Sequence, residues 1–175
     1  MKKISVIIII LSAVLFGGCS VQMEMNPVIF IERLSEKIGG NIFENKEIVY
    51  EDNKCICFIN DEFNTEYVLE FILDESDNIK KISLACNETD KAGNFINYIK
   101  DIIGVYSPDE NIEEIIGNLT ENGKMKPSFS YYETQWYSWS SYSDENGLYF
   151  SVSNKKLSEP ITAQYSLKPN DKSGY

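Results

Sequence analysis

The fold is decided by residues 130–150, which read SYYETQWYSWSSYSDENGLYF and include both tryptophans of the chain. Aromatic residues alternate with serines here, a pattern typical of β-strands. The segment Asp144–Gly147 predicts a four-residue hairpin loop around a type I turn, in which Gly147 can take a positive φ. We therefore interpret the stretch as one long β-hairpin.

The predicted loop also sets the register of the hairpin. It places Ser143 opposite Leu148, Ser141 opposite Phe150 and Trp139 opposite Val152. Because strand side chains alternate between the two faces, a core face and an outer face follow. The predicted core face carries Tyr137, Trp139, Phe150 and Val152. The predicted outer face carries Trp136, Tyr142 and Tyr149, separated by serines.

Two interpretations of the outer face remain open. Aromatic residues in strands usually pack, so the hairpin can simply be a strongly β-forming part of the core. Alternatively, Trp136, Tyr142 and Tyr149 form a binding surface, since rigid aromatic groups between serines are typical of antibody-like paratopes.

Charge and composition exclude several classes of function. The chain carries a formal net charge of −11, and its basic start contributes Lys2 and Lys3, so the rest is more acidic still. An acidic domain is repelled by nucleic-acid backbones and by anionic membrane surfaces. The chain contains no histidine, which excludes Ser-His-Asp and Cys-His catalysis, HExxH sites and imidazole ligation of metals.

The start of the chain predicts export. Lys2 and Lys3 precede an apolar run over residues 4–16, which is too short to span a bilayer but typical of a signal peptide. The segment Leu15–Cys19, LFGGC, resembles the lipobox of bacterial lipoproteins, although Phe16 departs from the usual aliphatic residue. The resemblance covers the first 20 residues only. It implies that Cys19 carries a diacylglyceryl thioether, and two acyl chains suffice for stable anchoring.

These features predict four segments. Residues 1–18 are a signal peptide, residues 19–25 a lipidated cysteine with a short tether, residues 26–168 a single domain, and residues 169–175 a flexible tail. The predicted location is extracytoplasmic, with a lipid anchor in a bacterial cell membrane.

The order of elements predicts an α+β fold. Asn26 and Pro27 begin a helix that ends at Gly39, and strand-like runs follow at 42–50, 54–59, 66–73 and 79–86. Two amphipathic helices follow, one ending before Gly104 and one starting at a capping box over Ser107–Glu110. Residues 118–126 are a polar connection into the hairpin, and residues 161–167 a last strand. We expect two layers, with an antiparallel sheet of about six or seven strands and three helices on one face.

The cysteines suggest packing or a disulfide. Cys55 and Cys57 lie two apart and therefore point to the same face of one strand. A disulfide of Cys86 with Cys55 or Cys57 requires their strands to be neighbours. Burial as free thiols is the simpler interpretation, because a free cysteine behaves as a small hydrophobic residue.

No catalytic, metal or cofactor site is evident. Asp74–Asn78 lacks the spacing of an EF-hand loop and predicts a solvated turn. Glu133 is the only acid in the aromatic strand, and a glycosidase needs a second carboxylate. We therefore expect a non-enzymatic binding module for a protein, peptide or cell-wall glycan. A structural or assembly accessory with edge-strand contacts is the alternative, and a carboxylate hydrolase is the least favoured.

Overall fold

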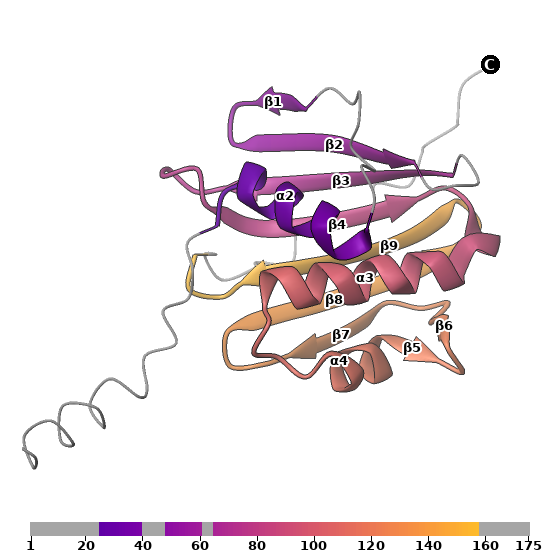
Figure 1. Cartoon of the computed structure of the whole chain (residues 1–175). Coiled ribbons are helices and arrows are strands. Elements are labelled where there is room, and N and C mark those ends of the chain that lie inside the picture. The colour runs from indigo at the N-terminus through magenta and orange to yellow at the C-terminus, as the bar shows by residue number, and fades with distance from the viewer. Residues whose placement is uncertain (1–24, 40–47, 61–64, 158–175) are drawn as a thin grey trace, which may run out of the picture.

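The computed structural model describes residues 25–39, 48–60 and 65–157, and the fold is α+β, as predicted. The main sheet has seven antiparallel strands in the order β1-β2-β3-β4-β9-β8-β7 (Figure 1). Their bounds are β1 (Val49–Glu51), β2 (Lys54–Asn60), β3 (Glu66–Leu73), β4 (Ile79–Cys86), β7 (Ser130–Glu133), β8 (Tyr137–Asp144) and β9 (Gly147–Asn154). The helices are α2 (Pro27–Ile38), α3 (Ala92–Tyr106) and α4 (Ile112–Leu119), with a 3-10 turn at Thr89–Lys91.

The first helix, α2, forms where its capping residues predict it. The Asn26 side chain accepts a hydrogen bond from the Ile29 backbone N–H at 3.0 Å, and Pro27 occupies the first helical position. Gly39 ends the helix in the left-handed conformation, with φ 78°. Local sequence alone therefore accounts for both ends of α2.

The other two helices differ from the prediction. α3 continues through Gly104 to Tyr106. Gly104 leaves room for the Lys37 side chain, whose Nζ would lie 2.7 Å from an added Cβ. α4 begins at Ile112 and not at Pro108, since the Asn111 side chain accepts the Glu114 backbone N–H at 3.3 Å and forms the cap. The capping box predicted at Ser107 is therefore wrong.

The strands follow the prediction closely along β3 and β4. Of the first predicted strand, the structure describes β1, and residues 41–47 lie outside the described ranges. The strand predicted at 161–167 and the tail also lie outside them. The connection at 118–126 contains a small hairpin of β5 (Thr120–Glu121) and β6 (Lys124–Met125). Asn122 and Gly123 both have positive φ there, as a two-residue hairpin turn requires.

The aromatic stretch forms three strands and not one long hairpin. The chain turns at residues 134–136, so β7 pairs with β8, and β8 pairs with β9. The predicted register of β8 and β9 is confirmed, with Trp139 opposite Val152. The expectation of a positive φ at Gly147 is wrong. Gly147 instead permits close approach of β4, because an added Cβ would lie 2.5 Å from the Cys86 carbonyl oxygen.

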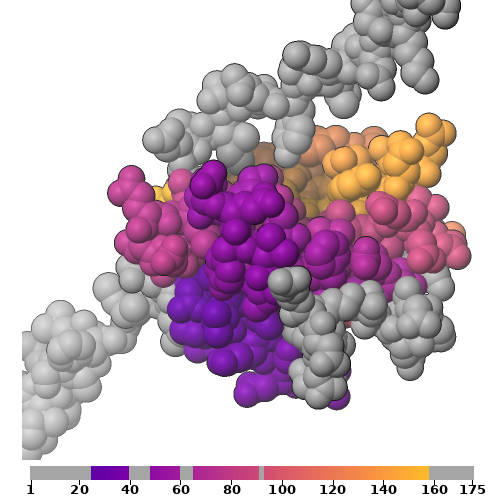
Figure 2. Space-filling model, turned by 90° about the horizontal axis from the view of Figure 1, so that it is seen from above, coloured from indigo at the N-terminus to yellow at the C-terminus, as the bar shows by residue number. Residues whose placement is uncertain are grey.

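The core lies between the sheet and the three helices. Phe30 of α2 packs edge-on against Phe71, and Tyr106 of α3 packs against Tyr137, both with ring centroids 5.4 Å apart. The Ser141 hydroxyl donates to the Leu119 carbonyl at the end of α4. The predicted core residues of the hairpin are all buried: Tyr137, Trp139, Phe150 and Val152. Figure 2 looks onto the sheet edge at β1 and β2, with α2 in indigo on one side.

Candidate binding surface

One face of the sheet carries none of the described helices, and we call it the open face. Its side chains come from alternate residues of β2, β3, β4, β9, β8 and β7, and most of them are half-buried. The pairing register aligns these side chains into three rows that cross the strands. Each row therefore brings together residues that are far apart in the sequence.

The first row, which we call the apolar row, lies nearest the β8–β9 loop. Its members are Phe58, Val68, Ala85, Tyr149 and Tyr142. Tyr142 is 37% exposed, and the other four are half-buried. An uncharged strip across five strands is notable in a chain with a net charge of −11, because the remaining surface must carry the excess charge.

The next two rows are increasingly polar. The serine row contains Ile56, Glu70, Ser83, Ser151, Ser140 and Tyr131. The charged row contains Lys54, Ile72, Lys81, Ser153, Ser138 and Glu133. The Ser140 and Ser151 hydroxyls form a hydrogen bond of 2.8 Å, and Lys54 forms an ion pair with Glu70 at 3.3 Å. The serine side chains are small, so they project less from the middle of the sheet than the tyrosines of the apolar row do.

Two of the three predicted surface residues meet in the apolar row. Tyr142 and Tyr149 face each other across β8 and β9, with ring centroids 4.3 Å apart and an interplanar angle of 13°. Parallel stacking covers one face of each ring with the other ring. The edges of this pair therefore offer more contact to a partner than its ring faces do.

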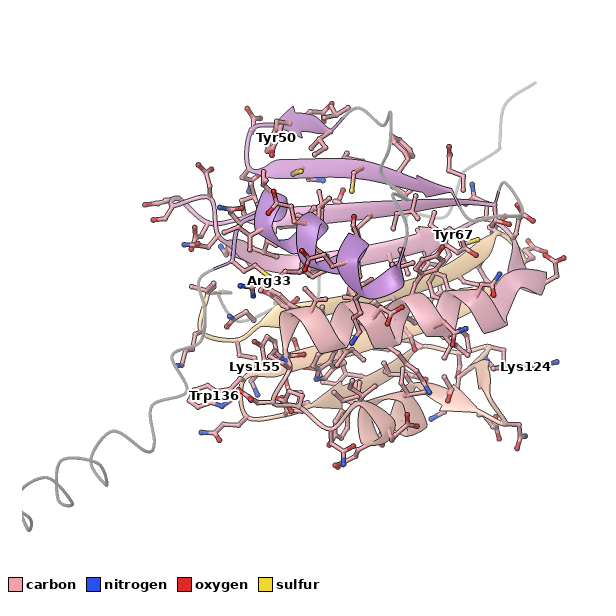
Figure 3. All side chains as sticks on the ribbon, viewed as in Figure 1. Arg33, Tyr50, Tyr67, Lys124, Trp136 and Lys155 are labelled. Carbon is pink, nitrogen blue, oxygen red and sulfur yellow. The ribbon has the colours of Figure 1, made fainter. Side chains whose placement is uncertain are left out.

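The third predicted residue, Trp136, lies elsewhere. It sits in the β7–β8 turn, six residues before Tyr142, which corresponds to about 20 Å along an extended strand. Its carbonyl accepts the Lys155 backbone N–H at 2.8 Å, and the Lys156 Nζ lies 4.0 Å from its ring centroid. Figure 3 shows Trp136 and Lys155 together at one end of the sheet. The structure thus does not place Trp136 in one patch with the two tyrosines.

Phe129 and Tyr131 are exposed aromatic residues that were not assigned from the sequence. They are 61% and 52% exposed, and their rings stack at 6.4 Å with an interplanar angle of 16°. Tyr131 belongs to the serine row and pairs with Ser140. Their alternation with Ser128 and Ser130 is the same pattern that marks the outer face of β8, so this signal was present in the sequence.

Glu133 is held as a carboxylate at the edge of the open face. It accepts a hydrogen bond from the Tyr131 hydroxyl and forms an ion pair with the Lys155 Nζ at 3.4 Å. The Tyr131 hydrogen bond, followed by Lys155, lowers the pKa of this carboxyl below its usual range. A general acid needs the opposite shift.

Neither disulfide considered from the sequence forms. Cys55, Cys57 and Cys86 are buried thiols on the helix-covered face, and none of the three is in a disulfide. β3 lies between β2 and β4, so Cys86 is two strand spacings, or about 10 Å, from the nearest position on β2. This separation exceeds the reach of a disulfide.

Within residues 25–39, 48–60 and 65–157, no group of three or more acids or cysteines is arranged to hold a metal ion. No helix in this part of the chain is long and apolar enough to cross a bilayer. Cys19 and the predicted leader lie outside the described ranges.

Comparison with known proteins gives no match. No family model, curated protein or solved structure matches this chain.

Proposed function

We propose that the protein is a lipid-anchored, extracytoplasmic binding module that recognises a protein partner through its open face. The observation that carries this proposal is the apolar row on a sheet face that no described helix covers. Contiguous, partly exposed apolar side chains on an otherwise acidic domain are typical of interaction surfaces. Anchoring rests on the lipobox-like segment that ends at Cys19.

The side chains of the open face favour recognition over chemistry. Glu133 has a lowered pKa and an ion-pair partner, and a hydrolase of the carboxylate type needs a second acid across the substrate. In the serine row the one carboxylate, Glu70, is ion-paired with Lys54, and the other polar groups are hydroxyls. The chain has no histidine to activate these hydroxyls. These groups suit hydrogen bonding at an interface.

The stacked tyrosines favour a protein partner over a glycan. A sugar ring binds by laying its C–H face on an open aromatic ring. Tyr142 and Tyr149 instead cover one face of each other, and the register places Ala85 beside Tyr149 and Val68 beside Ala85 in one apolar strip. Such a strip matches the apolar centre of a protein interface with a polar rim.

Site-specific photo-crosslinking in cells tests the recognition surface. A photoreactive phenylalanine analogue at position 142 should give a discrete crosslinked product, because this position lies in the proposed contact. The matched control is position 28, since Val28 is 49% exposed on α2, away from the open face. Equal yields of product from both positions, or none from position 142, would contradict the proposal.

The anchor is tested by the Cys19→Ser variant of the full chain. Loss of the thiol prevents acylation, so we expect this variant to leave the membrane fraction and to escape processing by the lipoprotein signal peptidase. Fractionation with immunoblotting measures both effects. Unchanged processing and membrane retention would show that Cys19 is not lipidated.

An accessory role through edge contacts is the second candidate function. β1 pairs with only the first three residues of β2, so within the described residues the backbone of positions 57–60 lies at the sheet edge. The same crosslinker at Tyr50 of β1, which is 56% exposed, discriminates the two candidates. A product from position 50 without one from position 142 would favour the edge.

A further inference from the structure

We propose that the partner at the open face is a second copy of this chain, bound in a symmetric face-to-face dimer. The two-fold axis of this dimer runs between β4 and β9, parallel to the strands. The inference rests on the proposed function in taking the open face as the recognition surface and, for the direction of the axis, in taking the chain as anchored to a membrane. In such a symmetric interface, every contact between two different residues, one from each copy, occurs twice.

The apolar row is self-complementary under this rotation. The axis exchanges β4 with β9 and β3 with β8, because these strands flank it symmetrically in the sheet. Ala85 of one copy then faces Tyr149 of the other, and Val68 faces Tyr142. Each small or aliphatic side chain thus meets a large aromatic one, as close packing of two sheets requires.

The serine row permits close approach at the centre of the interface. Ser83 of one copy faces Ser151 of the other, and Glu70 faces Ser140. These hydroxyls have remaining donor or acceptor capacity, since Ser140 and Ser151 share one hydrogen bond. Small residues beside the axis allow the usual spacing of about 10 Å between packed sheets.

The charged row is also compatible with the rotation. β2 exchanges with β7, so Lys54 of one copy lies toward Glu133 of the other. Lys54 already pairs with Glu70, and Glu133 with Lys155, so the contact would join two existing ion pairs into a network. Within the three rows, no two like charges oppose each other. The charges of these three rows are thus mixed in sign, whereas the chain as a whole is strongly acidic.

The position of Met25 selects the direction of the axis. The Met25 carbonyl accepts the Ile79 backbone N–H at 2.9 Å, so the chain enters the domain at the start of β4. Rotation about an axis parallel to the strands keeps both Met25 residues at the same end of the dimer. Both tethers then reach one membrane, whereas an axis along the rows would send them in opposite directions.

Crosslinking between engineered thiols tests the arrangement in membranes that contain the full chain. In the double variant Val68→Cys/Tyr142→Cys, the two thiols of one chain are three strand spacings apart, but those of two copies face each other. A short bis-maleimide should therefore give a product of twice the mass of the chain. The controls are each single variant and the pair Val68→Cys/Glu36→Cys, because Glu36 is exposed on α2.

The outcomes separate this inference from the proposed function. A product of twice the chain mass from the double variant, with little from the controls, supports the dimer. Equal products from the control pair, or no such product, overturn it. A product of another mass from position 142 in the photo-crosslinking experiment would overturn the dimer and leave the proposed function standing.

Charge variants give a second and independent test by sedimentation of the detergent-solubilised chain. Ala85→Lys should weaken association at least tenfold, and Tyr142→Ala tests the same contact if Ala85→Lys unfolds the domain. At the loop end, the register brings Glu66 of one copy toward Asp144 of the other. Glu66→Gln should therefore tighten association a few-fold, whereas Glu36→Gln should not.

The experiments also test an alternative occupant of the open face, which is the C-terminal end of the same chain. If the full chain sediments as a monomer and a variant that ends at residue 157 forms dimers, residues 158–175 occupy the face and the dimer proposal is wrong. If neither form associates and Glu66→Gln has no effect, the proposal is equally overturned.

Discussion

The two faces of the sheet differ although the same strands build them. On the face covered by the helices, Trp139, Phe71 and Cys57 are fully buried. On the open face, most of their chain neighbours are half-buried, Ser138 is buried, and Tyr142 further along β8 is 37% exposed. Neighbouring residues of one strand therefore lie alternately in the core and on the proposed interface.

The two faces of the β8–β9 hairpin contribute differently to the stability of the domain. Complete burial of a large apolar side chain contributes about 1.5–3 kcal/mol to folding, so the covered face dominates the stability of the domain. The open face gains less from folding and leaves apolar area partly exposed, which in our proposal binds a partner. Substitutions on the two faces should therefore separate stability from binding, and the following experiments measure that separation.

The largest expected effect is that of Trp139→Ala. It removes a fully buried side chain from between Tyr137 and Phe150 and should lower the free energy of unfolding by about 3–5 kcal/mol. Tyr142→Ala on the open face should lower it by no more than about 1 kcal/mol, the scale of one aromatic pair. Urea unfolding at low protein concentration measures both. Similar losses from the two variants would mean that the faces do not differ as described.

An intermediate effect is expected for Gly147→Ala. The added Cβ would lie 2.5 Å from the Cys86 carbonyl oxygen, so β4 and β9 must separate, at a cost of about 1–3 kcal/mol. Gly117→Ala is the matched control, because nothing lies within 4 Å of its added Cβ and alanine favours a helix by about 1 kcal/mol. The two variants should shift the thermal midpoint in opposite directions. A stabilising Gly147→Ala would refute the close approach.

The smallest effect concerns Cys57 and pH. Burial raises the pKa of the Cys57 thiol from 9.0 to about 12, so above pH 9 the unfolded chain loses this proton before the folded chain does. The contribution of the thiol to stability is complete below pH 9 and declines as the pH rises toward 12. At pH 10 the decline should be about 1.4 kcal/mol for this group. Cys57→Ala should flatten the curve of unfolding free energy against pH by that amount, and parallel curves would contradict burial of the thiol.

Local patterns in the sequence predicted the helices and strands better than they predicted how these elements pack against each other. The caps of α2, the bounds of β3 and β4, and the register of β8 on β9 are all as predicted, because each depends on residues a few positions apart. The predicted end of α3 was wrong, since the helix continues through Gly104, where the close approach of Lys37 from α2 leaves little room for a larger residue. The break at residues 134–136 was missed, although the Thr134 backbone N–H donates to the Tyr137 carbonyl across it at 2.9 Å. The contact of the Thr134 hydroxyl with the Glu110 carboxylate, at 2.7 Å, exists only in the folded chain.

The candidate surface was half predicted for the same reason. The alternation of aromatics and serines identified Tyr142 and Tyr149, whereas their continuation into Ala85, Val68 and Phe58 depends on the pairing of β4 with β9. That pairing joins segments more than 60 residues apart. No local pattern encodes it.

The amino-acid sequence by itself determined the class of fold, the two faces of the central hairpin and the absence of histidine chemistry, because periodicity and composition act within a strand or helix. The tertiary structure decided that Trp136 lies away from the tyrosines, that β3 separates Cys86 from Cys55 and Cys57, and that an apolar row crosses five strands. These outcomes depend on strand order, which is selected by the burial of the whole core and not by any single segment.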